Sequence, residues 1–215
     1  MSLQAELCAR RASAEPAYLD QIADAARQLE LWGVPARAKR VGDRAPDFAL
    51  STADGRVVVL SELLRDGPIV MSFFRGEWCS FCRAELDALL ASQPDMARLG
   101  ASLVLVSPEP ASAKLIGEVA TLGPSAYLLR DPMLGVALQY GLVYLVPESL
   151  RMFYLARQFD LSRELSTGSW LLPIPADFIV GANGVISLSY LESDFTRRLD
   201  PKILVEELQR GRLSC

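Results

Sequence analysis

Two cysteines separated by two residues are the strongest chemical signal in the sequence. They lie in the segment Trp78-Cys79-Ser80-Phe81-Cys82. At this spacing the second sulfur can reach the first, so that a sulfenic acid or mixed disulfide on one cysteine can be resolved by the other. The pair therefore predicts dithiol–disulfide redox chemistry.

Two other interpretations of the cysteine pair are half of a zinc site and two ordinary buried thiols. The chain has four cysteines and no histidine, so that further zinc ligands would have to come from Cys8 and Cys215, near the termini, or from carboxylates. We therefore expect neither a metal nor another cofactor. The lack of histidine also excludes Cys-His and Ser-His-Asp catalysis, so that a thiolate here needs another means of activation.

The elements around the motif supply that means. The run from Ile69 to Phe74 is too apolar for an edge strand and predicts a central one. A helical pattern with Leu86 and Leu89 on one face begins at Cys82. Thiols between such a strand and helix meet unpaired backbone N–H groups and the positive end of the helix dipole, which stabilise a thiolate.

Two arginines close to the motif can add positive charge. Arg75 and Arg83 flank the cysteines in the sequence. Each is interpreted equally well as a solvated surface charge.

The rest of the chain predicts an α/β fold. A hairpin is expected at residues 46–60, because the turn Ala53-Asp54-Gly55 separates two strand-like runs. Ser61 is expected to cap a short helix. Further strands are predicted at residues 102–106 and 126–129, helices at residues 114–121 and 201–210, a hairpin around Asn183-Gly184 and an insertion over the sheet at residues 133–170. This order favours parallel strands with right-handed crossovers.

Residues 1–40 are expected to form an N-terminal helical extension to one domain at residues 41–215. Apolar residues recur at helical spacing after Pro16, namely Tyr18, Ile22, Ala25, Leu29 and Trp32. This stripe must be buried, either on the chain's own domain or in a homodimer.

Composition limits the partners of the protein. The chain has 215 residues, of which 51% are hydrophobic, and a formal net charge of −4, which gives no field for a phosphate backbone. No run of apolar residues approaches the ~18 of a membrane span, and no signal peptide is recognisable. We expect no nucleic acid, no membrane and a cytoplasmic location.

Three segments together resemble the peroxiredoxin-like branch of the AhpC/TSA family. They are residues 41–48 (Val-Gly-Asp-Arg-Ala-Pro-Asp-Phe), residues 73–86 around the cysteine pair, and residues 173–180 with Asn183-Gly184. The resemblance covers roughly residues 41 to 210. It implies a thioredoxin-like fold, a central mixed sheet flanked by helices, with an extra N-terminal β-hairpin and thiol-based antioxidant chemistry.

The sequence departs from the family pattern at the peroxide site. The proline, threonine and peroxidatic cysteine of that pattern fall on Arg75, Cys79 and Cys82, so that only the cysteine is retained. The peroxide-orienting arginine falls on Pro175, which instead resembles the cis-proline beside a thioredoxin dithiol. The resemblance thus implies supporting roles for Trp78, Arg75 and Pro175, with a cis peptide bond before Pro175.

Two mechanisms remain open. In a thioredoxin-like mechanism, an exposed Cys79 attacks a substrate disulfide and Cys82 resolves the mixed disulfide. In a peroxiredoxin-like mechanism, Cys82 attacks a hydroperoxide and Cys79 condenses with the sulfenic acid. Either would be reset by a thiol electron donor of the thioredoxin or glutathione kind.

Two further possibilities concern roles outside this cycle. Cys8 or Cys215 could act as an additional resolving thiol, although ordinary thiols are expected there. The alternative to an enzyme is a redox sensor or binding protein on a thioredoxin fold, because that fold hosts many functions.

Overall fold

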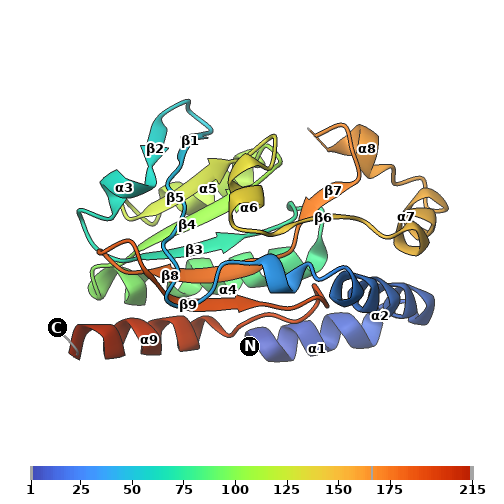
Figure 1. Ribbon diagram of the computed structural model, residues 1–215, viewed down its shortest axis with the longest axis horizontal. Coiled ribbons are helices and arrows are strands. Elements are labelled where there is room, and N and C mark those ends of the chain that lie inside the picture. The colour runs from blue at the N-terminus through green and yellow to red at the C-terminus, as the bar shows by residue number, and fades with distance from the viewer. Residues whose placement is uncertain (1, 166, 214–215) are drawn as a thin grey trace.

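A seven-stranded mixed sheet forms the centre of the molecule (Figure 1). The computed structural model describes residues 2–165 and 167–213. The strands, in spatial order, are β2 (Val57–Val59), β1 (Ala49–Thr52), β5 (Ala126–Arg130), β4 (Ser102–Ser107), β3 (Ile69–Phe73), β8 (Ala176–Val180) and β9 (Ile186–Leu191). Strands β3, β4 and β5 are parallel, whereas β8 is antiparallel to β3 and to β9. The sheet confirms the expected α/β class and both expected hairpins.

Helices cover both faces of this sheet and enclose two apolar cores. Alternate residues of a strand point to opposite faces, so that Val70 contributes to one core while Met71 and Phe73 contribute to the other. The first core includes side chains of α4 (Ser80–Arg98), α5 (Ala113–Ala120) and α9 (Pro201–Leu213), and the second those of α3 (Leu60–Leu63) and α6 (Gly135–Gln139). Both cysteines of the pair belong to the first core.

One of these helices begins differently from expectation. Val59 rather than Ser61 is the N-cap of α3, because the Asp47 carboxylate accepts a hydrogen bond from the Ser61 backbone N–H within the helix. Helix α4 includes Pro94 and runs on to Arg98.

The N-terminal extension forms two helices that pack on the chain itself. These are α1 (Leu3–Ser13) and α2 (Pro16–Leu31), followed by the 3₁₀ turn η1 (Pro35–Arg37). Ile22, Ala25 and Leu29 of α2 are buried in the first core, whereas Trp32, expected on the same stripe, is 48% exposed at the end of the helix. The apolar face of the extension is therefore buried without a second copy of the chain.

The segment expected as an insertion supplies several short elements. It contains α6, β6 (Val143–Leu145), α7 (Glu148–Leu155) and α8 (Leu161–Glu164), and β6 pairs with β7 (Leu171–Pro173) in a small antiparallel sheet. Strands β6 and β7 and helices α7 and α8 gather at one end of the molecule, where α7 packs against α2 (Figure 1). The insertion therefore meets the N-terminal extension in space.

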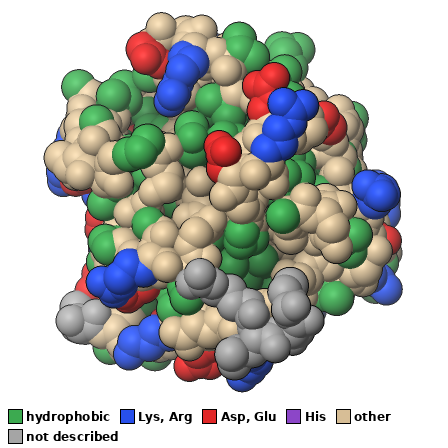
Figure 2. Space-filling model, turned by 90° about the vertical axis from the view of Figure 1, so that its left-hand side faces the viewer, with side chains coloured by type: hydrophobic (Ala, Val, Ile, Leu, Met, Phe, Trp, Pro, Cys, Tyr) green, Lys and Arg blue, Asp and Glu red, His purple; other side chains and the backbone are tan. Residues whose placement is uncertain are grey.

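The end of the molecule opposite α7 and α8 has a surface on which charged and apolar side chains are mixed. Figure 2 shows Lys and Arg side chains interspersed with Asp and Glu side chains and with apolar groups. This face carries no large patch of one charge sign. Among the described helices, none combines the length and the apolar character needed to cross a bilayer.

Candidate active site

The cysteine pair lies where β3 gives way to α4, as expected. Cys79 is the N-cap of α4, with extended backbone angles, and Cys82 lies in the first turn of the helix. Helix N-termini leave backbone N–H groups unpaired and carry a partial positive charge. The chain thus places both sulfurs at a position that favours a thiolate.

Both cysteines are reduced and buried. Cys79 is 4% exposed and Cys82 is fully buried. The expectation of an exposed Cys79 is therefore wrong, because aromatic side chains from distant elements cover it. The two sulfurs are near enough to affect each other's pKa, and they form no disulfide.

Arg75 is the charge next to Cys79. It is completely buried, and its Nη1 donates to Cys79 Sγ at 3.8 Å while its Nη2 donates to the Tyr154 hydroxyl at 3.2 Å. Its guanidinium carbon lies 4.7 Å from the Trp78 ring centroid and 3.9 Å from that of Phe195. No carboxylate among the described residues forms an ion pair with Arg75. A Cys79 thiolate would be its nearest counter-charge.

The surroundings give the two thiols opposite acidities. The hydrogen bond from Cys82, followed by the charges of Arg75 and Arg198, holds the pKa of Cys79 well below its usual range, although burial opposes this effect. Burial raises the pKa of Cys82 well above its usual range, and the bond and charge of Cys79 add to the rise. These shifts favour a thiolate on Cys79 and a thiol on Cys82.

Arg198, which follows β9, is a second buried arginine at the site. Its Nη2 donates to Cys82 Sγ at 3.4 Å, and its Nε lies 2.8 Å from Glu85 Oε2. That ion pair lacks the angular geometry of a hydrogen bond, yet both side chains are almost fully buried. Asp177 of β8 is buried within electrostatic range of both. Two carboxylates and one guanidinium thus lie behind Cys82.

Aromatic side chains from the extension and the insertion cover Cys79. The Tyr18 hydroxyl of α2 lies 3.2 Å from that of Tyr154 in α7. The centroid of the Trp78 ring lies 6.4 Å from that of Tyr154 and 5.4 Å from that of Phe159. The cover of the site is therefore built from segments far apart in the sequence.

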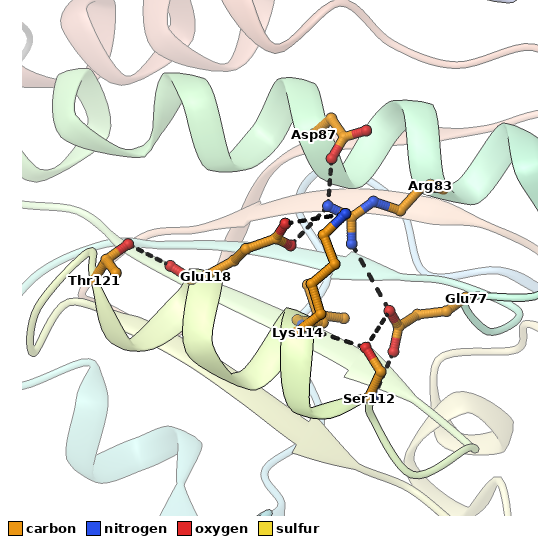
Figure 3. Close-up of polar contacts among 8 residues, drawn as sticks. Glu77, Arg83, Asp87, Ser112, Lys114, Glu118 and Thr121 are labelled. Carbon is orange, nitrogen blue, oxygen red and sulfur yellow. Dashed lines mark hydrogen bonds and ion pairs between the residues drawn. The ribbon is translucent and has the colours of Figure 1, made fainter.

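Arg83 does not reach the sulfurs. It forms ion pairs with Glu118 of α5 at 2.6 Å and with Asp87 at 2.5 Å, and lies 3.7 Å from Glu77 (Figure 3). Glu77 in turn accepts hydrogen bonds from the backbone and hydroxyl of Ser112, the N-cap of α5. Arg83 thus ties the loop before Cys79 to α5, and its charge is paired with carboxylates instead of being solvated or adding to the field at the sulfurs.

A comparison with family models places the chain. The model described as the AhpC/TSA family matches residues 41–189. The chain belongs to the AhpC/TSA family.

Solved structures agree with this assignment at the level of the fold. A mutant of peroxiredoxin 6 of Arenicola marina has a TM-score of 0.62 at 16% identity, covering 82% of this chain and 75% of that one. A yeast mitochondrial 1-Cys peroxiredoxin, described with a thiol resolving mechanism via glutathione/thioredoxin systems, has a TM-score of 0.59 at 17% identity. The match covers 82% of this chain and 78% of that one. Peroxidoxin BcpB from Mycobacterium tuberculosis has a TM-score of 0.56 at 20% identity, covering 80% of this chain and 97% of that one. These likenesses establish the thioredoxin-like fold, while curated protein sequences returned no match.

One expectation for this AhpC/TSA chain is wrong. No peptide bond among the described residues is cis, so that the bond between Ile174 and Pro175 is trans. Ile174 and Pro175 connect β7 to β8, and the Ile174 N–H donates to the Leu142 carbonyl, so that β6 and β7 set the path of the chain into β8. Pro175 is buried beside the start of β8.

The remaining cysteines lie away from the pair or outside the described residues. Cys8 is exposed on α1, and Cys215 falls outside the part of the chain that the structure describes. Within residues 2–165 and 167–213, no three acidic, cysteine or histidine side chains come together as metal ligands.

Several site residues of this AhpC/TSA chain were not expected from the sequence. They are Tyr18, Glu85, Tyr144, Tyr154, Asp177, Phe195 and Arg198. For Glu85 a signal existed, because it falls on the mostly apolar inner face of α4, one turn after Cys82. The others lie far from the motif in the sequence, and no spacing rule connects them with it.

Proposed function

We propose that this AhpC/TSA protein is a thiol oxidoreductase in which Cys79 attacks the substrate and Cys82 resolves the product. Arg75 and Trp78 support Cys79, and Pro175 contributes packing only. The observation that carries the proposal is the contact between the fully buried Arg75 guanidinium and Cys79 Sγ at 3.8 Å. This charge lowers the pKa of Cys79 and so favours a thiolate there. The thiolate is the nucleophile in reactions with disulfides and peroxides.

A hydroperoxide is the substrate that the family and the site favour. Attack by the Cys79 thiolate would break the O–O bond and leave Cys79 as a sulfenic acid. The Cys82 thiol would then condense with it, giving a Cys79–Cys82 disulfide and water. The burial of Cys79 favours a small molecule over a protein disulfide. A thiol donor of the glutathione or thioredoxin kind, as described for the yeast mitochondrial 1-Cys peroxiredoxin, would supply the two electrons that restore the dithiol in a reducing, cytoplasmic setting.

Serine variants of each cysteine test the assignment. Each variant receives one equivalent of hydrogen peroxide or of oxidised glutathione and is analysed by mass spectrometry. Cys82→Ser should carry a sulfenic acid or a mixed disulfide on Cys79, because the nucleophile remains and the resolving thiol is gone. Cys79→Ser should stay unmodified at Cys82, whose thiolate is disfavoured.

Cys8→Ser serves as the control, because Cys8 lies on the exposed surface of α1. Its turnover should equal that of the unaltered protein. A sulfenic acid on Cys82 in the Cys79→Ser variant would reverse the roles of the two cysteines. If neither variant forms an adduct, the protein is not a thiol oxidoreductase.

A further inference from the structure

The loop between β9 and α9 connects the dithiol with the N-terminal extension. It runs over residues 192–200, which form neither a helix nor a strand. Two of its side chains enter the site. The Phe195 ring lies over the Arg75 guanidinium, and Arg198 Nη2 donates to Cys82 Sγ at 3.4 Å. The loop therefore brings a buried positive charge to the resolving sulfur.

The other side of this loop is fastened to α1. Arg11 Nη1 lies 3.0 Å from Asp194 Oδ2 in an ion pair, and it also donates to the Thr196 hydroxyl. Gln4 Nε2 donates to the Arg198 backbone carbonyl at 2.9 Å. Helix α1 thus holds the loop at two places, and one of them is the backbone of Arg198 itself.

The carboxylate that meets Arg11 also organises the inner part of the loop. Asp194 Oδ1 accepts hydrogen bonds from the backbone N–H and the hydroxyl of Thr196, at 3.0 and 2.6 Å. Thr196 is buried, whereas the Arg11 side chain is 40% exposed. A partly exposed ion pair contributes only about 0–1 kcal/mol to stability. The main effect of Arg11 is therefore expected on the place of the loop, with a small effect on the stability of the fold.

Both sides of this contact lie outside the residues that the family model matches. The match begins at residue 41 and ends at residue 189, so that Arg11 precedes it and the loop follows it. The AhpC/TSA match therefore does not account for the connection between α1 and the site.

We infer that Arg11 is a positioning residue of the dithiol, which acts through the β9–α9 loop to keep Arg198 on the Cys82 sulfur. This inference rests on the proposed function, in which Cys82 resolves the adduct on Cys79. As Cys82 attacks, it loses its proton and negative charge gathers on its sulfur, where a guanidinium contact stabilises it. A loop that α1 does not hold loses this contact, which slows the second step of the cycle.

A small thiol reagent separates the two steps. Methyl methanethiosulfonate transfers its methylthio group to a thiolate and releases methanesulfinate, which leaves Cys79 as a methyl disulfide. The Cys82 thiol then attacks the Cys79 sulfur, so that the Cys79–Cys82 disulfide forms and methanethiol leaves with the proton. One equivalent is added to protein that carries Cys8→Ser and Cys215→Ser, and the decay of the Cys79 adduct is followed by mass spectrometry after acid quenching.

Arg11→Gln should slow the decay of the adduct by about 3-fold or more. Loss of a charge contact lowers the thiolate fraction by about 10-fold or more, and the higher nucleophilicity of a more basic thiolate recovers part of this loss. Gln4→Ala should act in the same direction, because it removes the anchor at the Arg198 carbonyl without changing the charge of the protein. Arg10→Gln is the matched control and should keep the rate of the unaltered protein, since Arg10 pairs with Glu6 within α1 at 2.9 Å.

The direction of the change decides between positioning and simple loosening. A loop that only loosened would admit water, favour the Cys82 thiolate and speed the step. A faster or unchanged decay in Arg11→Gln would therefore overturn the role of Arg11. An unaltered protein that forms the adduct and then the disulfide, but does not reduce hydrogen peroxide, would overturn the proposed substrate and leave the role of Arg11 intact. An adduct on Cys79 that never decays in the unaltered protein would overturn both.

Discussion

At the scale of single residues, the least usual feature is the buried charge cluster behind Cys82. Burial raises the pKa of Glu85 to about 8, with a smaller rise from Asp177, and the nearby Arg198 charge only partly opposes this. Burial also raises the pKa of Asp177 to about 6. One guanidinium cannot neutralise two carboxylates, so that the cluster holds a proton on Glu85 near neutral pH.

Replacing Glu85 with Gln should make the stability less dependent on pH. A carboxyl group whose pKa is raised on folding contributes stability that is complete below its ordinary value of 4.5 and is lost as the pH rises through about 8. Between these values, the free energy of unfolding of the unaltered protein should fall by up to about 1.4 kcal/mol per pH unit because of this group. Glu85→Gln cannot lose a proton, and it should remove that slope.

Urea unfolding between pH 5 and pH 9 measures this effect. Glu62→Gln is the matched control, because Glu62 is exposed on α3, and it should keep the slope of the unaltered protein. The same slope in Glu85→Gln would mean that Glu85 is ionised throughout this range.

At the scale of elements, the loop from Gly76 to Cys79 is constrained on two sides. Arg83 and Glu77 tie it to the start of α5 (Figure 3). Gly76 adopts a φ of +138°, and a Cβ at this residue would lie 2.5 Å from Trp78 Nε1. Only glycine adopts this backbone conformation without strain, so that the position of Trp78 over Arg75 depends on it.

Gly76→Ala should destabilise the protein by about 1–3 kcal/mol and slow the alkylation of Cys79 at neutral pH. The added methyl group strains the backbone and displaces Trp78, which packs on Arg75. Gly117→Ala is the control, because Gly117 is a helical residue of α5 with open space around its Cα. That variant should gain about 0.5–1 kcal/mol and keep the alkylation rate. Chemical denaturation and iodoacetamide kinetics measure both quantities, and a stable Gly76→Ala with an unchanged rate would contradict the proposed constraint.

At the scale of the whole molecule, the N-terminal extension is part of the core and of the site cover. Leu3 and Leu7 of α1 join Ile22 and Leu29 of α2 in the core that contains the cysteines. The Asp24 carboxylate accepts a hydrogen bond at 2.8 Å from the hydroxyl of Ser149 in α7. The extension and the insertion therefore hold each other over Cys79.

Two leucines on the same helix test this packing. Leu29 is 2% exposed, whereas Leu31 is 85% exposed. Leu29→Ala should lower the free energy of unfolding by about 2–5 kcal/mol, because it leaves a cavity in the core. Leu31→Ala should change it by no more than about 0.5 kcal/mol. Denaturation curves of the two variants decide the point, and equal effects would mean that α2 does not pack on the chain in solution.

The sequence determined the elements that hold the dithiol. An apolar strand followed by an amphipathic helix is a local pattern, and it located Cys79 and Cys82 at the start of α4. The turns Ala53-Asp54-Gly55 and Asn183-Gly184 likewise fixed both hairpins. Each of these features depends on neighbours within a few residues, which is the range over which spacing and turn chemistry act.

The tertiary structure alone decided the surroundings of the two sulfurs. Arg198 meets Cys82 across 116 residues of sequence, and Tyr154 meets Arg75 across 79. Burial of Cys79 and the trans bond before Pro175 likewise depend on how α2, α7 and β7 pack around the sheet. The acidity of a buried thiol is set by the charges and donors within a few ångströms of it. Which residues come that close follows from packing between distant segments, and no local pattern in the sequence records it.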